Sequence, residues 1–88
     1  MRTVILEKLA EAILDSASND PDFARVEDAW QGLEWRLSRR PSDGVERRFG
    51  YYLYKQLGIK GLRIPTIVAL YTFNDDTVTV HALALYKA

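Results

Sequence analysis

Hydrophobic and polar residues follow a helical period in the first half of this chain and a strand period in the second half. From Val4 to Ala17, apolar residues recur every three or four positions with charged residues between them, which predicts an amphipathic helix. Val4–Leu6 would equally suit a short strand that precedes a shorter helix. A second stripe of the same period predicts a helix from Pro21 to about Arg39, with Asp20 as its N-cap.

The second predicted helix has a clear apolar face. Its core stripe consists of Val26, Ala29, Trp30, Leu33 and Leu37. Trp35 falls off this stripe, on the flank of the helix. The segment Pro41–Gly44 then ends the helix, because its proline, polar residues and glycine favour a turn.

Three strand-like runs follow the helices. β-Branched and aromatic residues are frequent in Val45–Tyr54, Gly61–Phe73 and Thr77–Leu85. Short polar residues at Asn74–Asp76 separate the last two runs, which is typical of a β-hairpin. Both faces of the run before this turn are largely apolar, which suits a central strand or one covered on both sides.

The hairpin loop also predicts a register. If Asn74–Asp76 forms the loop, Ala69 lies opposite His81. Arg63, Tyr71 and His81 would then share one face of the sheet. These three side chains form the polar group with the best prospect of being a site.

Helices followed by strands predict an α+β fold. We expect a single domain over residues 1–88, with two N-terminal helices packed on a small antiparallel β-sheet of three or four strands. Its core should place Trp30, Leu33 and Leu37 against Val68 and Leu70 of the sheet.

Composition narrows the class of protein. The chain is 48% hydrophobic and 11% aromatic, values of a folded domain, and it contains no cysteine for disulfides or thiolate metal sites. It has no apolar run long enough for a transmembrane helix and no signal-peptide pattern at its start. We therefore expect a cytoplasmic protein without a membrane partner.

The net charge is zero, but the charges are distributed unevenly. Residues 1–35 hold three basic and eight acidic residues, whereas residues 36–63 hold eight basic and two acidic residues. Such a basic middle can bind an anionic partner, but solvated charges at helix ends and loops are the simpler explanation.

Few residues suggest catalysis. A single histidine excludes a histidine-rich metal site, and no glycine-rich phosphate loop is present. The serines fall at helix ends and turns, where capping explains them. We expect neither a metal nor a cofactor.

Several segments resemble the RelE/ParE superfamily of bacterial toxins. The resemblance covers most of residues 20–85 and is carried by Pro21, Leu33–Leu37, Arg40–Gly44, Gly61–Pro65 and Tyr71–His81. It implies a toxin component of a type II toxin–antitoxin system, which a cognate antitoxin neutralises. Some branches cleave mRNA on the ribosome, and others inhibit DNA gyrase without being enzymes.

The ribonuclease branch implies roles for particular residues. Arg63 would offset the charge of the scissile phosphate. His81, Tyr86 and Lys55 would assist it. RNA binding would use Arg47, Arg48 and Lys60.

Two departures from that branch leave catalysis open. The final strand has Ala82–Leu85 where the branch carries another arginine, and the chain is neutral where such toxins are basic. Two alternatives therefore remain. One is a gyrase-inhibitor-like toxin without enzyme activity, and the other is a non-toxic interaction domain in which Arg63 pairs with an acid such as Glu46.

Antitoxin binding is the property expected under both toxin hypotheses. A small sheet has edges with unpaired backbone groups, which an antitoxin segment could extend. Trp35, Tyr52 and Tyr54 are the candidate anchors for this partner, because aromatic residues supply large contact areas.

Overall fold

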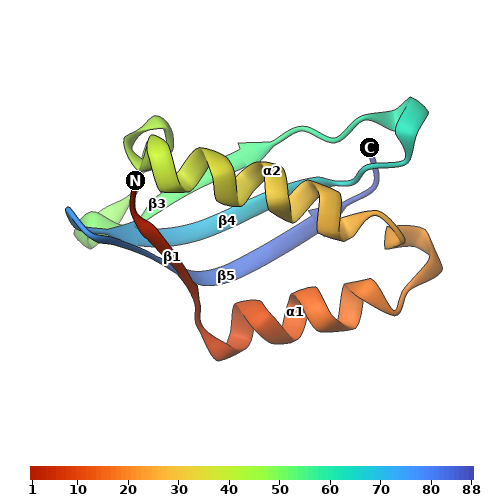
Figure 1. Ribbon diagram of the computed structural model, residues 1–88, viewed down its shortest axis with the longest axis horizontal. Helices are drawn as coiled ribbons and strands as arrows, with labels where there is room; N and C mark the ends of the chain where they lie inside the picture. The colour runs from red at the N-terminus through yellow and green to blue at the C-terminus, as the bar shows by residue number, and fades with distance from the viewer.

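The protein is an α+β domain in which two helices cover one face of a five-stranded sheet (Figure 1). The computed structural model describes residues 1–88. The helices are α1 (Lys8–Ser18) and α2 (Val26–Arg39). The strands are β1 (Thr3–Leu6), β2 (Val45–Glu46), β3 (Tyr52–Gln56), β4 (Thr66–Phe73) and β5 (Thr77–Tyr86). Short 3₁₀ helices lie at Pro21–Phe23, Pro41–Asp43, Arg48–Gly50 and Lys60–Leu62.

The strand order is β1-β5-β4-β3-β2, and β1 runs parallel to β5 while the other pairs are antiparallel. The α+β class and the two N-terminal helices are confirmed. The sheet is five-stranded and mixed, however, where we expected three or four antiparallel strands. The difference arises at Val4–Leu6, which belongs to a strand and not to the first helix. β1 pairs with β5 and so adds a parallel edge.

The core lies between the two helices and the sheet. Its buried apolar residues come from α1, from the whole length of α2, and from β4 and β5. Trp30, Leu33 and Leu37 are buried as expected. The expectation for Val68 and Leu70 was wrong, because the buried apolar residues of β4 are Ile67, Ala69 and Tyr71. Val68 and Leu70 occupy the opposite, uncovered face.

The hairpin between β4 and β5 explains the error in the predicted register. Asn74 closes the turn: its backbone N–H donates to the carbonyl of Thr77 at 2.9 Å, and its side chain accepts from the Thr77 N–H at 2.8 Å. Phe73 therefore pairs with Val78, not with Thr77. A β-bulge next to Leu70 shifts the register again.

The bulge leaves His81 without a direct partner, since Tyr71 pairs with Val80 and Leu70 pairs with Ala82. Tyr71 faces the helices, whereas His81 bonds to Thr72 on the uncovered face. The predicted shared face of Arg63, Tyr71 and His81 was therefore wrong.

The predicted strand Val45–Tyr54 is interrupted by a loop at residues 47–51. Within this loop Phe49 has φ 59° and Gly50 has φ 76°, so both adopt left-handed backbone conformations. For a residue other than glycine this conformation costs roughly 1–2 kcal/mol. The next run also begins later than predicted: β4 starts at Thr66, and residues 58–65 form a separate loop.

Tyr71 links the sheet to the end of α2. Its ring is fully buried, and its hydroxyl donates to the carbonyl of Pro41 at 2.5 Å. Burial raises the pKa of Tyr71 to about 12 from its ordinary value of 10.0. The bond holds the turn after α2 against the middle of the sheet.

Leu33→Ala should lower the free energy of unfolding by about 2–5 kcal/mol, because it removes buried methyl groups and leaves a cavity. Denaturant unfolding measures this loss. Gln31→Ala, on the exposed side of the same helix, is the matched control and should change stability little. Equal midpoints for Leu33→Ala and wild type would place the core elsewhere.

Stability should fall with rising pH through Tyr71. The folded-state pKa lies above the unfolded value, so the stabilisation is complete below about pH 10 and is lost as pH rises through about 12. Urea unfolding at several pH values between about 10 and 12 measures this effect. The free energy of unfolding should change less with pH for Tyr71→Phe than for wild type. Tyr86→Phe, whose ring is exposed, should retain the wild-type dependence. Identical pH profiles for all three proteins would contradict the assignment.

Candidate functional site

The sheet separates the predicted site residues into two groups at its opposite ends. Tyr86 pairs with Thr66 at the start of β4, which the loop carrying Lys60 and Arg63 immediately precedes. Tyr52 pairs with Tyr71 near the other end of β4, so the loop with Arg47 and Arg48 lies there. The two groups of cations therefore lie at opposite ends of β4.

The loop at residues 58–65 is closed by its own backbone. Ile59 and Ile64 exchange two backbone hydrogen bonds, at 2.9 and 3.1 Å. The Gly58 N–H donates to the hydroxyl of Thr66 at 2.9 Å. A Cβ at Gly58 would lie 2.5 Å from the carbonyl carbon of Pro65, so the close approach of the two chain segments requires glycine. This closure sets the positions of Lys60 and Arg63.

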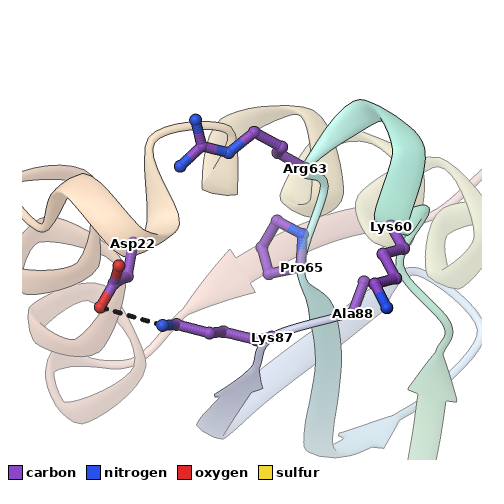
Figure 2. A pocket seen from close by; sticks show the side chains of 6 residues that line it. All are labelled: Asp22, Lys60, Arg63, Pro65, Lys87 and Ala88. Atoms are coloured by element: carbon purple, nitrogen blue, oxygen red, sulfur yellow. Dashed lines mark ion pairs between the residues drawn. The ribbon is translucent and has the colours of Figure 1, made fainter.

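A pocket of about 160 Å³ lies beside this loop. Figure 2 shows its lining side chains, which come from the loop, from the 3₁₀ helix before α2 and from the residues after β5. They are Asp22, Lys60, Arg63, Pro65, Lys87 and Ala88. Lys87 is paired with Asp22 at 3.3 Å. The pocket thus has three cationic side chains and one carboxylate.

Arg63 and Lys60 have no ion pair or side-chain hydrogen bond in the structure. Arg63 adopts a left-handed backbone conformation, with φ 59°, at the end of the 3₁₀ helix Lys60–Leu62. The predicted alternative pairing with Glu46 is absent, because Glu46 lies opposite Tyr52 at the far end of β3. Two unpaired cations beside a pocket can bind an anion such as a phosphate.

The structure does not bring the four predicted catalytic residues together. Tyr86 is at the same end of the sheet as Arg63, but it does not line the pocket. Lys55 pairs with Val68 and extends from the uncovered face. His81 lies further along that face, near the opposite end of β4.

His81 belongs to a separate polar cluster. In the neutral ring, Nδ1 donates to the carboxylate of Glu7 and Nε2 accepts from the Thr72 hydroxyl at 2.9 Å. The ring of Tyr51 packs against His81 with a centroid separation of 5.2 Å. This cluster joins residues from four segments of the chain on the uncovered face.

Arg47 and Arg48, predicted to bind RNA, lie in the loop between β2 and β3. Both are exposed, and neither has an ion-pair partner. Other basic residues of the middle segment are committed to contacts: Arg36 and Arg40 both pair with Asp43 at 3.3 Å. The basic residues of the segment without an ion pair are therefore those of the two loops, Lys55, and Arg39 beside Trp35.

Trp35 lies beside a second hollow, of about 320 Å³, between α2 and β1. The residue is 57% exposed, and the Arg39 guanidinium lies over its ring at 4.3 Å from the centroid. The lining residues are Met1, Arg2, Val4, Gln31, Glu34, Trp35, Ser38 and Arg39. We call this hollow the α2–β1 groove.

Tyr52 and Tyr54 are placed differently from Trp35. Both are only partly exposed and pack against the core on the helix side of the sheet. Tyr52 stacks on Tyr71 at 5.9 Å, and Arg36 lies over the Tyr54 ring at 5.8 Å. Tyr52 and Tyr54 therefore contribute to the packing of the domain. Trp35, in contrast, is exposed, and Arg39 lies over its ring.

Sequence reasoning missed Asp22, Lys87 and Glu7 as members of these clusters. Lys87 follows the last predicted strand, and a correct hairpin register would have placed it beside the loop at Arg63. Glu7 reaches His81 because β1 pairs with β5, and nothing local in the sequence indicates that pairing.

The structure contains no group of three or more His, Cys, Asp or Glu residues that could hold a metal ion. None of its helices is long and apolar enough to cross a membrane. Comparison with protein-family models, curated proteins and solved structures gives no match for this chain. Function must therefore be inferred from the geometry of the site residues.

Gly58→Ala should destabilise the domain and displace the loop that carries Lys60 and Arg63, because the new Cβ would overlap backbone atoms of Ile64 and Pro65. Thermal unfolding measures the first effect, and amide chemical shifts of residues 58–66 measure the second. Gly61→Ala is the matched control, since nothing lies within 4 Å of a Cβ there. Equal melting temperatures for the two variants would contradict the close approach at Gly58.

Proposed function

We propose that this protein is the toxin component of a type II toxin–antitoxin system and that a cognate antitoxin neutralises it by binding the α2–β1 groove. The observation that carries the proposal is this groove with its exposed Trp35. Large exposed aromatic residues next to a hollow are typical anchors of protein interfaces. The resemblance to the RelE/ParE superfamily supplies the class of partner.

The free edge of β1 supports a protein partner at this groove. β1 is the outermost strand of the sheet and has β5 as its sole neighbour (Figure 1). The backbone groups on its other side are available for an added strand. An extended antitoxin segment could bind β1 through its backbone and cover Trp35 with an apolar side chain.

The charges of the groove favour an acidic segment. Arg2 and Arg39 lie on its two sides, and Glu34 is its one acidic lining residue. The Arg2 side chain donates to the carbonyl of Asn74 at 2.6 Å, which holds it near the start of β1. Arg39 is held over the Trp35 ring. Both cations are thereby oriented before a partner binds.

The second candidate function is an endoribonuclease, and Arg63 is the observation that favours it. This residue and Lys60 are unpaired cations beside a pocket, as charge compensation of a phosphate would require. Two features weigh against it: the last strand provides no arginine, and His81 is held by Glu7 and Thr72 away from the pocket. Antitoxin binding is therefore the preferred proposal, and endoribonuclease activity is the second.

Co-purification with the product of the adjacent gene, followed by calorimetry, tests antitoxin binding. A disordered segment that folds on the groove should give a strongly negative heat-capacity change. Trp35→Ala should weaken binding by roughly 30-fold or more, as for an interface hot spot. Leu57→Ala, which removes an exposed apolar side chain outside the groove, is the control and should retain near-wild-type affinity. Failure to bind at high micromolar concentration would remove the main support for the proposal.

Expression in a bacterium tests toxicity and catalysis. The protein alone should arrest growth, and co-expression of the adjacent gene should restore it. If the endoribonuclease hypothesis holds, Arg63→Ala abolishes mRNA cleavage and leaves the fold intact. Growth arrest without cleavage would favour a gyrase-inhibitor-like toxin. Normal growth would favour a non-toxic interaction domain.

A further inference from the structure

The face of the sheet that the helices leave uncovered is apolar at its centre. Its central side chains come from β3, β4 and β5 and are Leu53, Val68, Leu70, Ala82 and Ala84. All of them are partly exposed, and none belongs to the core between the helices and the sheet. A sheet face that meets water normally carries polar residues at such positions. We call this group the sheet patch, and its composition is that of a face covered by another layer.

Large and small side chains of the sheet patch lie in separate rows. Val68 of β4 pairs with Ala84 of β5, and Leu70 pairs with Ala82. Cross-strand partners lie about 5 Å apart on the same face of a sheet. A row of large side chains on β4 therefore runs beside a row of small side chains on β5.

These two rows fit a second copy of the same patch. A two-fold axis parallel to the strands, between β4 and β5, places β4 of each copy over β5 of the other. Val68 of one copy then lies over Ala84 of the other, and Leu70 lies over Ala82. The side chains of sheets that pack face to face interdigitate in this way. A two-fold interface requires a patch that is complementary to itself, and the paired rows meet this requirement.

The charges around the sheet patch also suit a second copy. The same axis places β3 of each copy over β1 of the other, because these strands flank the β4–β5 pair. β3 carries Lys55, which has no ion pair. β1 is followed by Glu7, whose carboxylate accepts from His81 and is half-exposed. Each copy thus brings a cation to the side on which the other copy has a carboxylate.

The area of the face sets the expected strength of the contact. At about 3.3 Å per residue and about 4.8 Å between strands, β1, β3, β4 and β5 span roughly 430 Å² of each copy. Two copies together would therefore cover about 900 Å², close to the roughly 1,000 Å² at which specific interfaces begin. We expect a weak dimer, with a dissociation constant in the micromolar range.

We propose that two copies of this chain associate through the sheet patch as a two-fold dimer, with β4 of each copy packed over β5 of the other. The α2–β1 groove is lined by residues of α2 and of the segment that begins β1, and Val4 in it packs against the core on the helix side. The groove therefore stays open in the dimer. Dimerisation and antitoxin binding are thus independent and can be altered separately.

Sedimentation equilibrium over a range of protein concentrations tests the proposal. Wild type should shift from monomer to dimer as its concentration rises. Leu70→Asp places a carboxylate at the centre of the patch, so it should remain monomeric. Circular dichroism checks that this variant is folded, as expected for a residue outside the core. Leu9→Ala is the control, because it removes an exposed apolar side chain from α1 and should dimerise as wild type does.

A second pair of variants tests how the rows fit. Ala84→Leu enlarges the apolar surface but overfills the contact at two symmetric positions, so it should weaken the dimer by about 10-fold or more. Val68→Ala combined with Ala84→Leu exchanges the large and the small side chain at one level of the patch. This double variant should recover most of the wild-type affinity. Rescue of this kind cannot be attributed to a general change in stability.

Four results would overturn the proposal. The first is a wild-type protein that stays monomeric at high micromolar concentration. The second is an Ala84→Leu variant that associates as tightly as wild type or more tightly, which would indicate nonspecific apolar contact. The third is a dimer that Leu9→Ala abolishes. The fourth is wild-type protein that stays monomeric while the product of the adjacent gene binds it and fails to bind Leu70→Asp, which would make the sheet patch an antitoxin interface.

Discussion

The apolar face of α2 packs against the helix-facing side of β4. This contact determines which side chains lie on the uncovered face of the sheet. Leu33 and Leu37 are fully buried, as are Ile67, Ala69 and Tyr71 of the strand. Because strand residues alternate between faces, this contact leaves Val68, Leu70 and Thr72 on the uncovered side. The His81 cluster, Tyr51 and Lys55 all lie on that side as a result. The α2–β4 contact therefore determines which residues lie on the uncovered face of the sheet.

The helical half of the fold follows from the sequence because its signals are local. The stripe of α2 and the position of Trp35 outside it come directly from helical periodicity. In β4 both faces are apolar, so hydrophobic alternation cannot say which one is buried. The bulge opposite Leu70 also leaves no local sequence signal. The buried face of β4 and the register of its pairing with β5 are therefore known only from the structure.

The candidate site was predictable in part. Lys60 and Arg63 lie together because they share one short loop, and short-range proximity can be read from sequence. His81 was assigned to the wrong neighbours because its true partners, Glu7 and Thr72, depend on the parallel pairing of β1 and on the bulge. Residues far apart in the chain become a site only through such long-range pairing.

The pairing of β1 with β5 also has a consequence for how the chain folds. β1 starts at Thr3, and its single neighbour in the sheet begins at Thr77. Contacts between such distant segments form slowly, because a long loop must close before they contribute. During synthesis α1 and α2 emerge well before β5, which contributes Val78, Val80 and Leu83 to the core. The apolar face of α1, which packs against β5, therefore remains uncovered until the last strand leaves the ribosome, so the domain completes its core only when β5 has been translated.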